Sequence, residues 1–145
     1  MVLGKAETFL PLGSLIRWWS PPLVTDIDPI RKGSRRMARA KLIVMYPSPN
    51  DVEAFEAVYR NEHVPLAVSK LQGKTKIVAT KVLGSPQGAA RFYRIAEVHF
   101  PSMEALEACA ASEGAKETLA NAVKISTGGE PIFLVAEEET FKFQQ

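Results

Sequence analysis

From residue 37 onward, hydrophobic and polar positions follow the regular periods of strands and helices. β-rich or alternating runs predict four strands, at Lys41–Tyr46, Lys74–Leu83, Arg91–Phe100 and Ile132–Val135. Apolar residues three and four apart predict helices over 51–71, from Ser102 to Ala110 and over Ala115–Lys124. The order β-α-β-β-α-β is that of a ferredoxin-like α+β domain, and 145 residues accommodate one such domain.

Local signals predict where the helices begin, bend and end. Asn50 fits the N-cap of the first helix, with Glu53 as its capping-box partner. Pro65 is expected to kink this helix because its ring removes one backbone donor, and Gly73 ends it. In the second helical region we expect Gly114 to interrupt the helix.

The alternation of side chains along the third predicted strand indicates what covers each face of the sheet. Residues of one parity are mainly apolar and are expected to meet the helices; they are Phe92, Arg94, Ala96, Val98 and Phe100. The other parity mixes aromatic, aliphatic and titratable groups, in Tyr93, Ile95, Glu97 and His99. A mixed face of this kind suits a sheet that is covered by a second subunit, with a cavity between them. The pattern therefore predicts a homodimer.

Residues 1–36 differ from the domain predicted over 37–145. They hold six basic and three acidic residues, whereas the rest holds twelve basic and thirteen acidic residues, so the domain gives no electrostatic reason to bind nucleic acid. The apolar stretch Phe9–Ile16 is far shorter than the ~20 residues that span a bilayer, so no membrane partner is expected. We expect a disordered or irregular extension; the alternative is a partner-binding tail that uses Trp18 and Trp19.

The composition limits which cofactors and which cellular compartment we expect for this protein. The single cysteine, Cys109, excludes an internal disulfide and fits a reducing, cytoplasmic location. With only His63 and His99 to join it, a structural zinc site is not expected. No GxGxxG motif follows a predicted strand, so neither a flavin nor a nicotinamide cofactor is expected.

Two segments carry a family resemblance. The first runs from Tyr46-Pro47 through Phe55 to Leu66, and its most specific part is the pattern aromatic-xxx-His-x-Pro-Leu at Tyr59 to Leu66. Together with Phe92–Phe100 it resembles the EthD family of the dimeric α/β-barrel superfamily. The resemblance covers residues 40–138 and implies a ferredoxin-like protomer whose sheet packs against its mate, with a small pocket in each subunit. The superfamily includes small monooxygenases, lactone isomerases, polyketide cyclases and haem-degrading enzymes. Residues 37–145 contain no tryptophan to complete the Asn-Trp-His set of the last group, so haem is not expected.

His63 is the leading candidate for chemistry. It lies four residues after Tyr59 and eight after Phe55, so the three share one helical face. Its ordinary pKa lies near neutral pH, which suits a general acid or base. The alternative is a histidine that donates to a carbonyl freed by Pro65. Tyr59 could orient a ligand through its hydroxyl, or simply pack in the core.

Glu97 and His99 are the second pair of candidates. They share one face of a strand, about 7 Å apart. A carboxylate in a partly apolar pocket would have a raised pKa and could relay protons. The alternative is that one or both lie at the rim, in water or in a salt bridge with Lys76 or Lys81.

These residues predict a cofactor-independent enzyme acting on a small, largely apolar organic molecule, with monooxygenase- or other oxidoreductase-like, isomerase-like or cyclase-like activity. The expected catalytic residues are His63, Tyr59 and Glu97, and the expected substrate-binding residues are Phe55, Tyr93 and His99. Proton transfer next to a carbonyl, or on an activated aromatic ring, is within reach of one histidine in a dry pocket. One alternative is a non-catalytic protein that carries a metabolite for a partner enzyme. Another is a structural dimer with a filled barrel.

Overall fold

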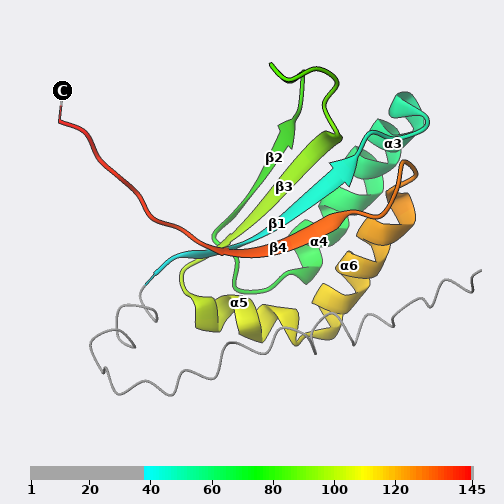
Figure 1. Ribbon diagram of the computed structural model, residues 1–145. Coiled ribbons are helices and arrows are strands. Elements are labelled where there is room, and N and C mark those ends of the chain that lie inside the picture. The colour runs from blue at the N-terminus through cyan, green and yellow to red at the C-terminus, as the bar shows by residue number, and fades with distance from the viewer. Residues whose placement is uncertain (1–37, 145) are drawn as a thin grey trace, which may run out of the picture.

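The computed structural model describes residues 38–144, so the extension expected over 1–36 lies outside the described residues. Figure 1 shows one sheet with helices on one side of it. The elements are β1 (Ala40–Pro47), α3 (Val52–Val58), a π-helical turn (Tyr59–His63), α4 (Val64–Lys70), β2 (Lys76–Lys81), β3 (Phe92–Phe100), α5 (Met103–Ala110), α6 (Glu113–Ile125) and β4 (Ile132–Glu137). The predicted β-α-β-β-α-β order is confirmed.

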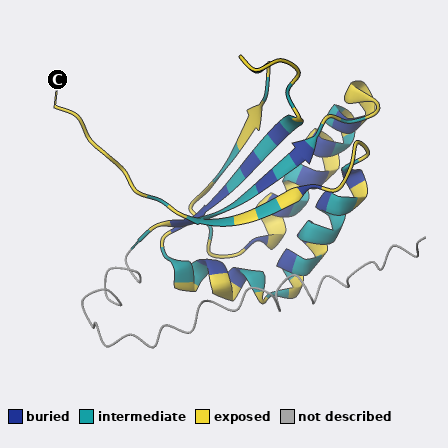
Figure 2. Ribbon diagram, viewed as in Figure 1, coloured by how far each residue is buried: buried dark blue, intermediate teal, exposed yellow. Residues whose placement is uncertain are grey.

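The sheet is antiparallel throughout, with strand order β2-β3-β1-β4. The two longest strands, β1 and β3, lie at its centre (Figure 2). Buried residues fall on alternate positions of both strands, except that the last three residues of β3 are all buried. On β3, Ala96, Val98 and Phe100 are buried in the core, as their parity predicts. None of the helices described in residues 38–144 is long and apolar enough to cross a bilayer.

The N-cap of the first helix is one residue later in the chain than the capping-box pattern predicts. The Asp51 carboxylate accepts the Ala54 backbone N–H at 3.0 Å, so Asp51 is the N-cap and the prediction of Asn50 is wrong. The Asn50 side chain instead donates to the Thr127 carbonyl at 2.9 Å. This amide therefore joins the loop after β1 to the loop after α6.

Where a kink is expected at Pro65, the structure has a π-helical turn just before the proline. The Val64 N–H donates to the Tyr59 carbonyl, five residues back, and α4 then continues with Pro65 in its first turn. Pro65 has no N–H to offer the carbonyl of Asn61, so the ordinary ladder cannot continue through this point. The extra residue of the π turn absorbs the break without ending the helix.

Ser112, and not Gly114, separates the two helices of the second helical region. The Ser112 hydroxyl accepts the Ala115 N–H at 3.1 Å and caps α6, and Gly114 lies within the first turn. A side chain at position 114 would clash with α4, because a Cβ there would lie 2.5 Å from the Lys70 carbonyl oxygen. The predicted interruption at Gly114 is therefore wrong, and this glycine allows α6 to approach the end of α4.

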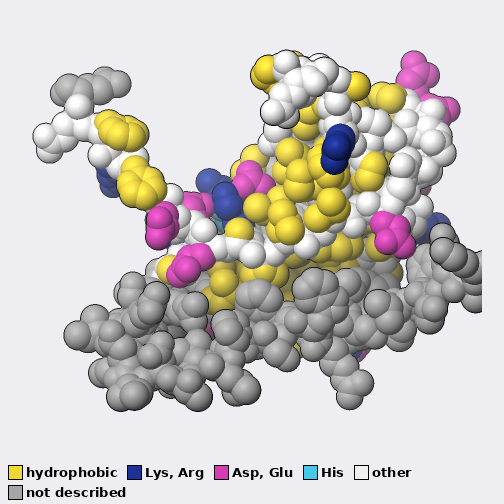
Figure 3. Space-filling model, viewed as in Figure 1, with side chains coloured by type: hydrophobic (Ala, Val, Ile, Leu, Met, Phe, Trp, Pro, Cys, Tyr) yellow, Lys and Arg dark blue, Asp and Glu magenta, His cyan; other side chains and the backbone are white. Residues whose placement is uncertain are grey.

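The other face of the sheet carries no helix among the described residues (Figure 1). Hydrophobic side chains gather on the sheet in the view of Figure 3. Ile132 and Leu134 of β4 are exposed there, although both are large and apolar. We call this surface the open face.

Candidate functional site

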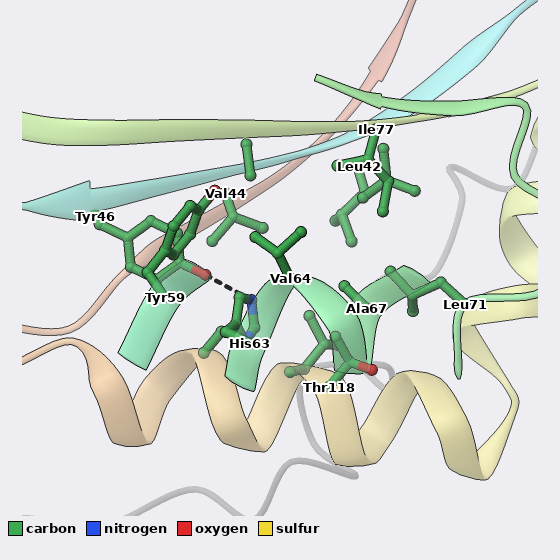
Figure 4. A pocket seen from close by; sticks show the side chains of 14 residues that line it. Leu42, Val44, Tyr46, Tyr59, His63, Val64, Ala67, Leu71, Ile77 and Thr118 are labelled. Carbon is green, nitrogen blue, oxygen red and sulfur yellow. Dashed lines mark hydrogen bonds between the residues drawn. The ribbon is translucent and has the colours of Figure 1, made fainter. Parts of the chain in front are cut away.

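A small cavity lies between the sheet and the helices that cover it (Figure 4). Its walls are mainly aliphatic; the largest aliphatic side chains are Leu42, Leu71, Ile77 and Leu119, and the next largest are Val44, Val64 and Val98. Its polar side chains are Tyr46, Tyr59, His63 and Thr118. The volume is about 30 Å³, which is room for one or two water molecules. A larger ligand therefore has to displace part of the aliphatic wall.

The π-helical turn and the helix before it bring three rings onto the sheet. Tyr59 stacks on Phe55 with ring centroids 5.5 Å apart, and His63 stacks on Tyr59 at 5.8 Å. The prediction that these three residues share one face is confirmed. Phe55 lies behind Tyr59, outside the lining of the cavity, whereas Tyr59 and His63 line it.

His63 is held at both ring nitrogens by side chains from different elements. Asn121 Oδ1 of α6 lies 2.7 Å from Nδ1, and the Tyr46 hydroxyl of β1 lies 3.0 Å from Nε2. Because an amide oxygen can only accept, Nδ1 carries the hydrogen and Nε2 accepts from Tyr46. The His63 ring makes no hydrogen bond to a backbone carbonyl within residues 38–144, so the alternative of a histidine that donates to a carbonyl freed by Pro65 is wrong.

Burial sets the protonation of this site. It lowers the pKa of His63 below 6.5, against a smaller opposing effect of the Asn121 hydrogen bond. Burial also raises the pKa of Tyr46 and of Tyr59 above 10. At neutral pH the cavity therefore holds a neutral imidazole beside two protonated phenols. This set of groups can take up a proton at Nε2 and can donate hydrogen bonds to an oxygen.

Replacing Asn121 with leucine is expected to lower the pKa of His63 further, because the hydrogen bond that favours the protonated ring is lost. The measurement is an NMR titration of the His63 ring, which also reports its tautomer. Lys124→Ala, on an exposed position of the same helix, is the matched control and should leave the titration unchanged. An unaltered His63 pKa in Asn121→Leu would show that the amide does not control this ring.

Tyr59 lies between the cavity and a buried ion pair. The Arg94 guanidinium lies over its ring, 5.1 Å from the centroid, and donates two hydrogen bonds to Glu56 at 2.8 and 2.7 Å. The hydrogen bonds within the described residues leave the Tyr59 hydroxyl unused, although the residue is buried. This hydroxyl is therefore available to a ligand.

Glu97 lies on the open face, away from His63. Its neighbours Ala96 and Val98 face the helices, so alternation turns Glu97 to the other side. Lys41 donates to it at 2.7 Å and holds its pKa below the ordinary value, so the expected raised pKa is wrong. Glu97 does form a salt bridge, but the predicted partners Lys76 and Lys81 are wrong, because its partner is Lys41 of the neighbouring strand.

Tyr93 does not lie on the face of the sheet that the alternation along the strand predicts. Tyr46 pairs with Arg94 and Pro47 pairs with Phe92, so Tyr93 is the extra residue of a bulge. Its ring turns toward the helices, 5.8 Å from Phe55, and its buried hydroxyl has no hydrogen-bond partner in the described region. The placement of Tyr93 on the mixed face is therefore wrong, and it does not line the cavity.

His99 remains on the open face, where its parity puts it. Its Nδ1 lies 3.4 Å from a Glu138 carboxylate oxygen, and its Nε2 is buried with no hydrogen-bond partner in residues 38–144. The structure therefore places His99 with Glu97 but brings neither to the cavity that contains His63. Within the described residues, no cluster of three or more His, Cys, Asp or Glu side chains could hold a metal ion.

Tyr46 and Asn121 are the two site residues that the sequence analysis misses. Tyr46 is the last residue of the predicted first strand, a buried apolar run, and the family resemblance includes it without giving it a role. Asn121 follows the buried Thr118 by one helical turn and precedes the buried Ile125, so a polar residue beside a buried stripe is its only signal.

Comparison with known proteins identifies the family. The EthD domain model matches residues 48–124. An EthD family protein from Bacillus halodurans is 31% identical, with a TM-score of 0.64 over 70% of this chain and 99% of that chain.

Two more distant structures share the fold. A dimeric ferredoxin-like protein of unknown function from Jannaschia sp. is 16% identical, with a TM-score of 0.53 over 69% of this chain and 99% of that chain. A hydroxynitrile lyase from Passiflora edulis is 15% identical, with a TM-score of 0.55 over 73% of this chain and 99% of that chain. No curated protein matches the chain. With more than half of its length matched by the domain model, the chain belongs to the EthD family.

Proposed function

We propose that this protein is a small-molecule enzyme in which His63 removes a proton from a small, largely apolar organic compound. The observation that carries the proposal is the neutral, buried imidazole whose tautomer Asn121 fixes and whose Nε2 faces the cavity beside Tyr46. A cofactor is not needed for this step. The cytoplasm, inferred from the single cysteine, is the proposed location.

The proton that best fits such a base is a C–H next to a carbonyl. The Tyr46 hydroxyl first turns from Nε2 to the carbonyl oxygen of the substrate, which frees the lone pair of Nε2. As Nε2 then takes the proton, the electron pair of the C–H bond moves toward the carbonyl oxygen, which becomes negatively charged. The hydroxyls of Tyr46 and Tyr59 can donate to that oxygen in a water-poor cavity, where such hydrogen bonds are strongest. Isomerisation, cyclisation and cofactor-free oxygenation can all start from this enolate. The small cavity favours substrates with few non-hydrogen atoms.

Exchange of substrate hydrogen for solvent deuterium tests the proton transfer before the full reaction is known. The full chain is incubated in D₂O with small ketones and lactones, and NMR follows loss of the hydrogens next to the carbonyl. We expect His63→Gln to reduce the exchange rate by about 10²- to 10⁴-fold, the usual contribution of a general base. Glu97→Gln is the control and should exchange normally. Equal rates for the wild type and His63→Gln on every compound would overturn the proposal.

A non-catalytic carrier is the second candidate. It is favoured by the hydrogen bonds that already occupy both ring nitrogens of His63. A carrier would bind one of these compounds and protect its hydrogens from exchange, with equal affinity in the wild type and in His63→Gln. Binding by calorimetry on the same samples therefore separates the two functions.

We further propose that a second copy of the chain covers the open face. The exposed Ile132 and Leu134 give this face an apolar surface that association would remove from water. The Jannaschia protein with the same fold is described as dimeric, which supports the proposal. Two sheets packed in this way would place the Lys41–Glu97 pair inside the assembly.

A further inference from the structure

The cavity beside His63 has a polar end and an apolar end. Tyr46 and His63 lie together at one end of the lining in Figure 4, which we call the polar end. Leu42, Ile77 and Leu71 lie at the opposite end, which we call the apolar end. A molecule that places an oxygen beside His63 therefore has its remaining atoms directed toward aliphatic side chains.

Thr118 is the polar side chain that lines the cavity beyond the polar end. Its hydroxyl donates to the Gly114 carbonyl, one turn back in the same helix, at 2.7 Å. The hydrogen of this hydroxyl is therefore used within α6, and none of the other side chains that line the apolar end has a polar hydrogen. A second polar group of a ligand would be buried there without a donor, which is unfavourable.

Two rows of side chains connect the polar end to the apolar end. In the β1 row, Tyr46 and Leu42 point to the same side of the strand and lie about 13 Å apart by strand rise. In the helical row, His63, Ala67 and Leu71 follow one another at intervals of four residues and cover about 12 Å by helix rise. The two rows run in the same direction in Figure 4. The lining is therefore long in one direction, along β1.

Ala67 has the smallest side chain in the helical row. It lies half-way between His63 and Leu71, and it is buried against the sheet. Its methyl group leaves more room between α4 and β1 than any larger side chain would leave at this position. A ligand that extends from His63 toward the apolar end has to pass Ala67.

Leu71 closes the apolar end at a fixed place. It is the C-cap residue of α4 and is only 3% exposed. The Lys74 ammonium group donates to the carbonyls of Val68 and Leu71, at 2.6 Å in both cases. These two hydrogen bonds hold the end of the helix, and with it the backbone that carries the Leu71 side chain.

We propose that the substrate is a straight-chain aliphatic carbonyl compound whose hydrocarbon tail lies along β1 past Ala67, and that Leu71 limits the length of the tail. The carbonyl meets His63 and Tyr46 at the polar end. A chain that is one atom wide displaces less of the aliphatic wall than a ring does, which matters in a cavity of about 30 Å³. This inference rests on the proposed function, because the position of His63 decides which end of the compound carries the carbonyl.

Binding of a homologous series of ketones tests the position of the tail. The full chain is titrated with straight-chain methyl ketones from butanone to decanone, and protein NMR gives each dissociation constant. In the wild type we expect the affinity to rise about fourfold with each methylene, and to stop rising when the tail reaches Leu71.

Two variants change the space for the tail in opposite directions. Ala67→Val should end the rise at a shorter ketone and weaken binding of the ketone preferred by the wild type at least 10-fold. Leu71→Ala should extend the rise by about as many carbons as the substitution removes. If one variant fails to fold, the other still decides the result. Val68→Ala, at an exposed position of the same helix, is the control and should keep the wild-type preference.

The outcomes separate the tail from the chemistry of His63. The same dependence on chain length in all four proteins, or no binding of any ketone in the series, would overturn the proposed position of the tail. Deuterium exchange that requires His63 but is unaffected by chain length would overturn the tail and leave the base intact. Binding that depends on chain length without any deuterium exchange would instead overturn the proton transfer and support the tail.

Discussion

Replacing Arg94 with methionine is expected to destabilise the fold by about 3 kcal/mol, because it leaves the Glu56 carboxylate without its buried partner. The two side chains form a bidentate pair, and those of Arg94 and Glu56 are only 6% and 17% exposed. The same guanidinium lies over the Tyr59 ring, so its loss also removes a cation–π contact behind the cavity. Urea unfolding at neutral pH measures the change.

Arg60→Met is the matched control, because Arg60 also donates to Glu56, at 2.9 Å, but from an exposed position on the same helical segment. An exposed pair four residues apart contributes about 0.3–0.5 kcal/mol, so this variant should unfold nearly as the wild type does. Equal losses in the two variants would mean that the burial of Arg94 adds nothing to the pair.

The pH dependence of the Arg94 effect has a definite sign. Arg94, more than any other neighbour, lowers the pKa of Glu56 from 4.5 to about 2. The folded state therefore holds a charged Glu56 at pH values where the unfolded chain already binds a proton. The stability that the pair contributes is complete above pH 4.5 and is lost as the pH falls through about 2. We expect the difference between the wild type and Arg94→Met to shrink across that interval.

Periodicity predicts the fold well because it records which side of each element is buried. The alternation along β3 predicts that Val98 faces the helices and Glu97 faces away, and the structure confirms both. It fails at Tyr93 because a single extra residue in the strand turns the side chain to the opposite face. The residue types around Tyr93 carry no mark of that bulge.

The candidate site is predictable only where it is local. Tyr59 and His63 lie one helical turn apart, so spacing alone places them together. Tyr46 and Asn121 lie 17 and 58 residues from His63, and only the packing of β1 and α6 brings them to its ring. In the same way, only the strand register brings Glu97 to its partner Lys41, which lies 56 residues away in the chain. Periods show which face a residue occupies, but they carry no information about its neighbour across that face.

Replacing Gly128 with alanine is also expected to destabilise the fold by about 3 kcal/mol, at the upper end of the range for overpacking. A Cβ at this position would lie 1.8 Å from the Ser48 carbonyl oxygen and 2.6 Å from its carbon. These are backbone atoms of the loop after β1, so no side-chain rotation can relieve the clash. Gly84→Ala is the control, because a Cβ there meets nothing within 4 Å, and its stability should change by less than about 0.5 kcal/mol.

The same substitution tests how the fold holds His63. Gly128 belongs to the loop after α6 and Ser48 to the loop after β1, so their contact fixes how closely these two elements approach. His63 bridges the same two elements through Asn121 and Tyr46. If the loop contact sets that spacing, Gly128→Ala should admit water and raise the pKa of His63 toward 6.5 in an NMR titration, because burial is what lowers it. A destabilised variant with an unchanged His63 pKa would instead mean that the packed rings around His63 hold the site by themselves.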